Sequence, residues 1–165
     1  MRNEFNLFQN GFFQDVLSPL ASLEVFHVME KYLIDLPDKL FQGQKVLREL
    51  KVKGDQIQGF RSELFSNLTS LTSLQLVNMN FSQDGLKPGV FDSLTGLTNF
   101  SLTGPGLALI PETVFSQNKN LQRLEFAFFS CSPLKPPCRV SLPKFARNIS
   151  SLQVGRNCRS LLEND

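Results

Sequence analysis

A thirteen-residue pattern recurs four times in this chain of 165 residues, and it limits the possible folds more than any other feature. Each copy begins with an apolar residue followed by phenylalanine and ends in a short alternating stretch. The copies are LFQGQKVLRELKV (residues 40–52), LFSNLTSLTSLQL (64–76), VFDSLTGLTNFSL (90–102) and VFSQNKNLQRLEF (114–126). Their phenylalanines, Phe41, Phe65, Phe91 and Phe115, lie 24, 26 and 24 residues apart. Self-similarity at such a period predicts a solenoid in which each copy is one turn.

The end of each copy predicts one strand per turn. Its apolar–x–x–apolar–x–apolar core is Leu47, Leu50, Val52 in the first copy, then Leu71, Leu74, Leu76, then Leu97, Phe100, Leu102, and last Leu121, Leu124, Phe126. Alternate residues of a strand point to opposite faces, so Leu50 and Val52 point inward while Lys51 points outward. Stacked turns then form a parallel sheet with one polar face, and neighbouring turns complete each other's burial.

Two more copies fit the pattern at the ends of the chain. The first has Leu20, Leu23 and Val25 at the core positions with Phe13 at the phenylalanine position, and the second has Ile149, Leu152 and Val154 after a lengthened turn. We therefore predict one solenoid domain over residues 1–165 with about six turns. Terminal repeats normally need a cover, and neither end has a cysteine-rich cap, so we expect a fragment of a longer ectodomain.

The steps Leu36-Pro37 before Phe41 and Ile110-Pro111 before Phe115 resemble the "typical" extracellular leucine-rich repeat of animals. The irregular turn lengths, the phenylalanine position and the cysteine-containing insertion are most similar to Toll and Toll-like receptor ectodomains. The resemblance implies an α/β solenoid, a leucine-rich-repeat horseshoe with a parallel concave β-sheet and irregular or short helical convex segments. It also implies a protein-binding receptor module in innate immune or developmental signalling, with a protein ligand such as a secreted cytokine-like protein, and receptor dimerisation.

The sequence departs from that family at the ninth position of the repeat, where the family has an inward asparagine. Val28, Asp55, Met79, Pro105 and Phe129 stand there, and in the last copy Asn157 does. A side-chain amide satisfies buried backbone groups that apolar residues leave unpaired. We therefore expect an irregular hydrogen-bond ladder in the loops.

Polar residues at outward strand positions are the candidate ligand contacts on the concave face. They are Glu49, Lys51 and Lys53 on one turn, Ser73 and Gln75 on the next, and Arg123 and Glu125 further along. Residues at these positions can vary without disturbing the apolar core. Solubility alone also requires polar outward residues, and that need explains any single one of them equally well.

Four glycosylation sequons indicate an extracellular protein: Asn67, Asn80, Asn99 and Asn148 each precede x-Ser or x-Thr. A random order of the same residues would give about 1.6 such motifs. Asn67 follows Phe65 on the predicted convex side, where a glycan is easily accommodated. Asn99 instead takes an outward strand position, where a glycan would obstruct the concave face and move a partner to the lateral edge or to other turns.

The three cysteines, Cys131, Cys138 and Cys158, are disulfide candidates, and one intrachain pair leaves one thiol over. Cys131–Cys138 would close the proline-stiffened segment CSPLKPPC. Cys131–Cys158 would link neighbouring strands about 5 Å apart. Both pairings stay open beside three free thiols. A structural metal site needs a second ligand pair at fixed spacing, which does not accompany these cysteines.

Composition excludes several other functions. The net charge of +2 is spread along the chain, which gives no electrostatic reason for nucleic-acid binding. The sequence contains no run of about 18 apolar residues, which a membrane span would require, and its start lacks the form of a secretory signal. The one histidine, His27, has no nucleophile close in sequence, and Gly104-Pro105-Gly106 is explained as a turn. We expect neither enzymatic activity nor a cofactor.

Two functions from different classes remain open. The first is a ligand-binding part of a cell-surface receptor, and the second is a secreted matrix or adhesion repeat protein with a structural role. A cytosolic repeat sensor is a third, which unmodified sequons and free thiols would favour.

Overall fold

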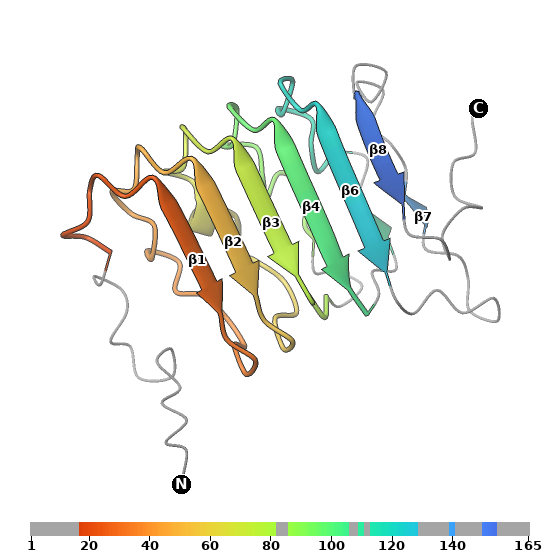
Figure 1. The fold of residues 1–165 in the computed structure, drawn as a ribbon, viewed down its shortest axis with the longest axis horizontal. Coiled ribbons are helices and arrows are strands. Elements are labelled where there is room, and N and C mark those ends of the chain that lie inside the picture. The colour runs from red at the N-terminus through yellow and green to blue at the C-terminus, as the bar shows by residue number, and fades with distance from the viewer. Residues whose placement is uncertain are drawn as a thin grey trace, which may run out of the picture.

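The computed structural model describes residues 17–81, 86–105, 109–110, 113–128, 139–140 and 150–154. A six-stranded sheet runs through these ranges in the order β1-β2-β3-β4-β6-β8 (Figure 1). Its strands are β1 (Val25–Met29), β2 (Glu49–Lys53), β3 (Ser73–Val77), β4 (Asn99–Gly104), β6 (Arg123–Phe128) and β8 (Ser151–Val154), and every neighbouring pair is parallel. Each strand pairs with the next one along the sheet, as stacked turns of a solenoid require.

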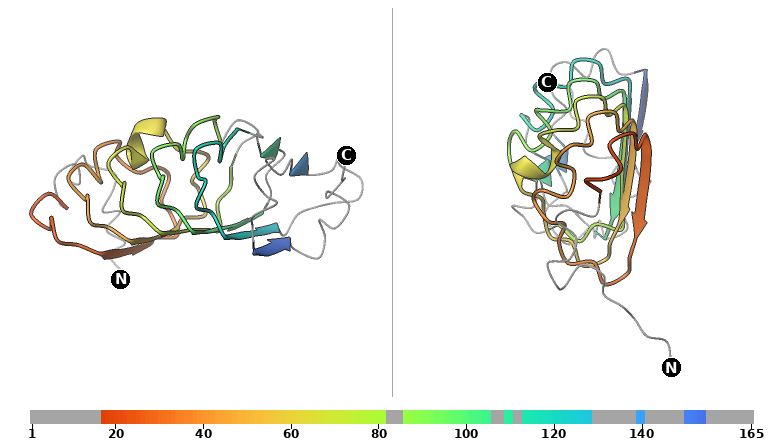
Figure 2. Two further views of the ribbon diagram at one scale, coloured as in Figure 1. Left: turned by 90° about the horizontal axis from the view of Figure 1, so that it is seen from above. Right: turned by 90° about the vertical axis from the view of Figure 1, so that its left-hand side faces the viewer.

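The connecting segments lie together on one side of the sheet (Figure 2). In the described residues they contain one short 3₁₀ helix, η1 (Ser62–Phe65), and two short parallel strands, β5 (Leu109–Ile110) and β7 (Arg139–Val140). The other described connections are turns. The predicted architecture, a leucine-rich-repeat solenoid with a parallel sheet and irregular or short helical convex segments, is confirmed.

Register between the strands brings the predicted core residues together. Leu50 pairs with Leu74, Leu74 with Phe100, and Phe100 with Leu124 across β2, β3, β4 and β6. These four side chains are buried, as are the inward residues two positions further along each strand. One apolar layer therefore runs behind the sheet and is shared by all these turns.

The recurring phenylalanines form a second apolar layer on the convex side. Phe41, Phe65, Phe91 and Phe115 are all buried. The ring centroids of Phe65 and Phe91 are 5.5 Å apart, and those of Phe91 and Phe115 are 5.6 Å apart and stacked. Phe100 joins the two layers, since its ring lies 5.1 Å from Phe91 and 4.9 Å from Phe115. Repetition of one phenylalanine position thus produces an aromatic row from Phe65 to Phe115.

A ladder of hydrogen bonds fixes the start of each strand. The carbonyl of Arg48 accepts the backbone N–H groups of Thr72 and Ser73 and the hydroxyl of Thr72. The carbonyl of Thr72 accepts the same three donors from Thr98 and Asn99 in the next turn. Ser150 repeats the pattern on Gln122 before β8. The hydroxyl residues at this position therefore stabilise the stacking of one turn on the next.

In the described loops that follow the strands, the ninth-position residues form no regular asparagine ladder, as the sequence predicted. Met79 is buried there, while Asp55 is partly exposed and accepts a hydrogen bond from the Asn78 side chain at 3.3 Å. Phe129 and Asn157 lie outside the described residues. Buried side-chain amides occur instead on the convex side, at Gln44 and Asn118.

In the first turn, the residues at the core positions differ from the prediction. Val25 pairs with Glu49 and is 50% exposed, so it points outward. Phe26 and Val28 pair with Leu50 and Val52 and are the inward residues of β1. Leu17, buried and 24 residues before Phe41, takes the phenylalanine position, and Phe13 lies outside the described residues. Both frames match the apolar pattern, and the register with β2 decides between them.

Gly104 corrects a second prediction, because it ends β4 and pairs with Phe128 instead of opening a turn. A Cβ at this position would overlap the carbonyl oxygen of Met79. The backbone N–H of Met79 also donates to the carbonyl of Thr103 at 2.9 Å. Glycine is therefore required for the close approach of two backbones at this point.

The last copy is confirmed at the level of backbone pairing. Leu152 pairs with Leu124, and Val154 pairs with Phe126, across β6 and β8. The offset of 28 residues matches the predicted lengthened turn. Ile149 and the cysteine-containing insertion lie outside the described residues.

Candidate interaction surface

The outward face of the six-stranded sheet, called the sheet face below, collects all the predicted contact residues. Glu49, Lys51, Lys53, Ser73, Gln75, Arg123 and Glu125 all stand at outward strand positions and are partly or fully exposed. Glu49 pairs with Ser73 and Lys51 pairs with Gln75, so β2 and β3 present one continuous polar area. Strand β4 separates that area from Arg123 and Glu125 on β6.

Parallel register arranges the sheet face in three rows. The first row, at the strand starts, is Val25, Glu49, Ser73, Asn99, Arg123 and Ser151, and the second is His27, Lys51, Gln75, Ser101, Glu125 and Gln153. The third row contains Met29, Lys53 and Val77 on the first three strands, with Thr103 and Ala127 on β4 and β6. Each row thus crosses from one turn to the next with one residue per strand.

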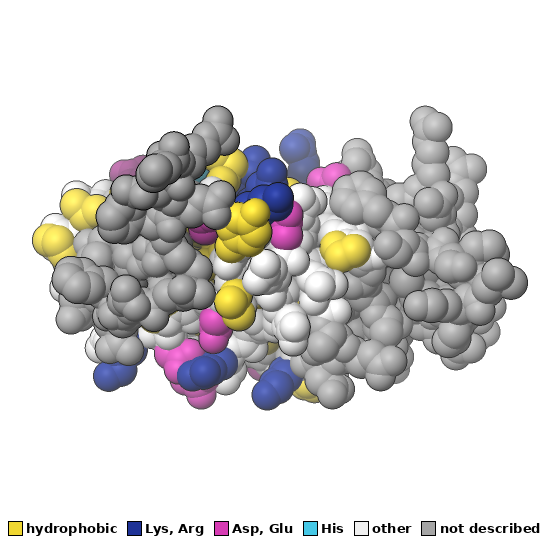
Figure 3. Space-filling view, turned by 90° about the horizontal axis from the view of Figure 1, so that it is seen from below, with side chains coloured by type: hydrophobic (Ala, Val, Ile, Leu, Met, Phe, Trp, Pro, Cys, Tyr) yellow, Lys and Arg dark blue, Asp and Glu magenta, His cyan; other side chains and the backbone are white. Residues whose placement is uncertain are grey.

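Charge is unevenly distributed over this face. In the part of the chain that the structure describes, Lys51 and Lys53 form no ion pair. The outward residues of β3 and β4 are uncharged, and charge returns on β6 with Arg123 and Glu125. Figure 3 shows basic side chains gathered beside hydrophobic ones on the side at which the strands end. Among the described residues, the positive charges of the sheet face that form no ion pair are therefore Lys51 and Lys53 on β2 and Arg123 on β6.

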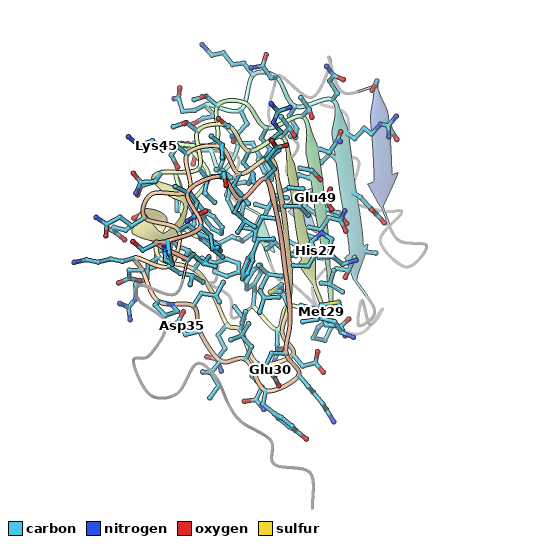
Figure 4. The ribbon with its side chains drawn as sticks, turned by 60° about the vertical axis from the view of Figure 1, so that its left-hand side comes forward. His27, Met29, Glu30, Asp35, Lys45 and Glu49 are labelled. Carbon is cyan, nitrogen blue, oxygen red and sulfur yellow. The ribbon has the colours of Figure 1, made fainter. Side chains whose placement is uncertain are left out.

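His27 is a member of the sheet face that the sequence did not predict. Its Nε2 atom lies 2.8 Å from Oε1 of Glu49 on the neighbouring strand, and both side chains are partly exposed (Figure 4). A carboxylate beside an imidazole is one part of a general-base arrangement, and the hydrogen bonds of the described residues join no hydroxyl or thiol to His27. Extending the 24-residue period back from Lys51 would have placed His27 in this row.

Glu125 is also engaged within the sheet. The hydroxyl of Ser101 donates to its Oε2 atom at 2.9 Å across β4 and β6. Glu49 and Glu125 therefore each have a partner on a neighbouring strand, in contrast to the two lysines of β2. Those lysines have the larger unsatisfied capacity for a charged partner.

Apolar side chains on the sheet face were likewise missed by the sequence. Met29 is 66% exposed and stands next to Lys53 in the third row. The partly exposed Val77 lies on the other side of Lys53. Val25 is half exposed at the start of β1. Methionine is enriched in protein–protein interfaces, and polar side chains form their rim.

The sequons fall on different sides of the solenoid. Asn67 follows η1 on the convex side and is partly exposed, and Asn80 is exposed after the end of β3. Asn99 is exposed at the start of β4, between Ser73 and Arg123 in the first row. Asn148 lies outside the described residues. A glycan on Asn99 would stand between the two halves of the sheet face.

Other site types find no support in the described residues. Cys131, Cys138 and Cys158 lie outside them, so neither disulfide pairing is tested. No group of three or more metal-ligating side chains comes together within them. Among these residues, no helix has the length and apolar character needed to cross a membrane.

Comparison with known proteins agrees with the fold. Residues 21–81 match the leucine rich repeat family. Keratocan from Gallus gallus and keratocan from Coturnix japonica are each 25% identical to the chain over 151 residues, which is 87% of this chain. The chain spans 42% of the length of these curated relatives. Sequence and structure together therefore show a leucine-rich-repeat solenoid, with the family pattern matched over residues 21–81.

Proposed function

We propose that this chain is a protein-binding leucine-rich-repeat module, without catalytic function, that binds its partner on the sheet face. The observation that carries the proposal is the pair Lys51 and Lys53, two lysines on one strand without an ion pair in the described structure. They serve no packing role, since the core is filled by the inward residues of the same strand. Solubility explains one exposed lysine, whereas two beside exposed Met29 also form a contact area.

The proposed partner presents an acidic segment with an apolar neighbour. Carboxylates would reach the ammonium groups of Lys51 and Lys53, and an apolar side chain would cover Met29 and Val77 in the third row. Ser73 and Gln75 supply hydrogen-bonding groups on the adjoining strand, and Arg123 and Glu125 extend the contact if the partner reaches β6. A secreted cytokine-like protein and dimerisation of the module are the partner classes that the resemblance suggests.

Charge reversal tests the surface directly. A partner would be selected by screening a library of secreted proteins against the immobilised chain. We expect Lys51→Glu/Lys53→Glu to weaken its binding about tenfold or more, because attraction becomes repulsion. The matched control is Lys39→Glu/Lys45→Glu, which makes the same change of net charge at exposed residues outside the sheet. Equal loss in both variants, or unchanged binding in the first, would refute the sheet face as the binding surface.

The proposed location is extracellular, in one of two settings. The first is a receptor ectodomain of the Toll-like class, which the resemblance suggests and which would use the module in innate immune or developmental signalling. A secreted matrix or adhesion protein with a structural role is favoured by the similarity to the two keratocans. A full-length sequence with a membrane span and an intracellular signalling domain would select the first setting. One that ends in a cysteine cap would select the second.

Domain organisation is part of the same proposal. Residues 1–165 form one solenoid of about six turns that belongs to a longer protein. The length of the relatives supports this, because the chain spans 42% of them.

Secretion from eukaryotic cells tests the compartment. With an added signal peptide, the intact mass would be measured before and after glycosidase treatment, together with thiol labelling. Glycan on Asn67 or Asn148 and one disulfide are expected. Occupancy of Asn99 would restrict the partner to one side of the sheet face. Absence of glycan with three free thiols would contradict the extracellular location and favour a cytosolic repeat protein.

A further inference from the structure

The single histidine of the chain lies inside the proposed contact area. His27 pairs in register with Lys51, so the two side chains stand next to each other in the second row of the sheet face. Its Nε2 atom lies 2.8 Å from Oε1 of Glu49, which stands in the first row of the neighbouring strand (Figure 4). The two side chains are 41% and 37% exposed, so a partner on this face can reach both. The imidazole therefore contacts the one acidic side chain of β2.

The charged groups that face this histidine from the rows of the described sheet belong to β2. On β1 itself the outward neighbours Val25 and Met29 are uncharged, and β1 pairs with β2 alone among the described residues. Outside the rows, the flanking charged residues are Glu24 and Arg48, which pair with each other at 3.8 Å, and Glu30 and Lys31 after β1. Strand β2 presents Glu49, Lys51 and Lys53. One carboxylate and two ammonium groups leave one net positive charge here while the imidazole is neutral, and two once it is protonated.

Protonation of His27 changes the charge that an acidic partner meets. While the imidazole is neutral, the carboxylate of Glu49 stands uncompensated near Lys51 and repels the carboxylates proposed to bind there. An imidazolium 2.8 Å from Glu49 would offset that repulsion. Histidine is the side chain that ordinarily gains its charge as the pH falls from about 8 to about 5. Acidic surroundings therefore make this part of the sheet face more positive.

We propose that His27 and Glu49 form a pH-sensitive switch that strengthens the binding of an acidic partner to the sheet face as the pH falls below neutrality. The switch rests on the proposed function, because it acts on binding at Lys51 and Lys53. Its sign follows from linkage. Carboxylates of a bound partner favour the charged imidazole, so partner binding takes up a proton, and proton binding strengthens partner binding by the same factor. Above the range in which histidine titrates, the lysines bind against the repulsion of Glu49.

A fluorescently labelled hexa-aspartate peptide is the probe, because its carboxylates stay ionised above about pH 5 and it contains no histidine. Its affinity for the full chain would be measured by fluorescence anisotropy at about pH 7.5 and about pH 6. We expect about fivefold tighter binding at the lower pH, the effect of one added unit charge about 4 Å from a peptide carboxylate in water. His27→Gln should show one affinity at both pH values, since glutamine still donates a hydrogen bond but gains no charge.

The matched control keeps one histidine in the chain. His27→Gln/Gln42→His moves the imidazole to an exposed position after Phe41 on the convex side. This variant should behave as His27→Gln alone, because the charge then lies on the opposite side of the turn from the lysines and is screened by salt. Calorimetry in two buffers of different ionisation enthalpy gives a second readout. At about pH 6.5, peptide binding should take up protons in the parent chain and none in either variant.

The outcomes separate the switch from the proposed function. If Lys51→Glu/Lys53→Glu weakens peptide binding while the parent chain binds equally at both pH values, the sheet face binds acidic groups and the switch is refuted. Equal pH dependence in the parent chain and in His27→Gln, or its return in the Gln42→His control, would also refute the switch. Peptide binding that is absent from the parent chain, or that lysine reversal leaves unchanged, would refute the proposed function, and the switch would fail with it.

Discussion

At the scale of single residues, the buried amides of Gln44 and Asn118 show how this solenoid satisfies its convex backbone. Asn118 Nδ2 donates to the carbonyls of Phe91 and Leu94 in the preceding turn at 3.0 and 2.8 Å. Gln44 Nε2 donates to the carbonyl of Leu17. Both stand three residues after the phenylalanine position, where Leu68 and Leu94 are found in the turns between them. A side-chain amide at this position therefore forms hydrogen bonds to the preceding turn, whereas a leucine contributes apolar packing alone.

Removal of the Asn118 side chain should lower the free energy of unfolding. We expect Asn118→Ala to cost about 1–3 kcal/mol in urea denaturation, because two hydrogen bonds are lost in a buried place. Asn120→Ala is the control, since the exposed Asn120 makes a single bond to the carbonyl of Thr95. Equal costs for the two variants would show that burial of the amide is unimportant.

A methyl group at Gly104 should also destabilise the fold. We expect Gly104→Ala to cost about 2 kcal/mol or more in the same assay, since the backbones of β4 and Met79 must move apart. In Gly96→Ala the nearest atom would be the Thr69 carbonyl oxygen at 3.3 Å, which requires only a small adjustment. A Gly104→Ala variant as stable as the parent chain would contradict the close approach.

At the scale of the structural element, the aromatic row determines how the convex segments pack. Phe91 has ring neighbours on three sides, in Phe65, Phe100 and Phe115. Phe41 contacts one described ring, that of Phe26, at 6.0 Å. The first turn has Leu17 at this position, so leucine is compatible with the local backbone. The contribution of each phenylalanine should therefore increase with its number of aromatic neighbours.

Replacement of these rings by leucine tests that dependence. We expect Phe91→Leu to lower the free energy of unfolding by about 2 kcal/mol, from lost ring pairs and incomplete filling of the site. Phe41→Leu should cost about half as much, because fewer ring contacts are removed. A larger loss for Phe41→Leu, measured by urea denaturation, would argue against an aromatic row that acts as one unit.

At the scale of the whole molecule, stability is distributed along the stack. Strand β3 has a paired strand on each side, whereas β1 pairs with β2 alone within the described residues. Core side chains are accordingly buried completely in the middle turns and partly in the first. In a repeat protein each turn contacts only its neighbours, so local opening should begin at an end.

Hydrogen exchange of the unmodified chain should show this gradient. We expect the backbone amides of β3 and β4 to exchange most slowly and those of β1 at least about tenfold faster, because opening an end breaks one interface between turns instead of two. Peptide-level mass spectrometry measures both strands in one experiment. Uniform protection from β1 to β4 would instead indicate a single cooperative unit.

Much of this arrangement could be predicted from the sequence, because the repeat is local and strict. The core of β2 to β6, the phenylalanine position and the outward placement of Lys51, Gln75 and Glu125 all follow from period and alternation. The first turn could not be placed by pattern alone, since Leu20-x-x-Leu23-x-Val25 and Leu23-x-x-Phe26-x-Val28 are both acceptable copies. The 24-residue spacing from Leu23 to Leu47, which the next turn repeats, was the sequence signal that favours the second of these copies.

The amino-acid pattern alone establishes the period, the inward residues of the strict copies and thus the solenoid, because burial at fixed intervals is compatible with few other folds. Tertiary structure was needed to assign the inward residues of β1, since hydrogen bonds to β2 distinguish two equivalent apolar patterns. It also decided that His27 meets Glu49, that Gly104 approaches Met79, and that Asn118 binds the carbonyls of an earlier turn. Each of these contacts joins residues 22 to 27 positions apart, and only the stacking of turns brings them together.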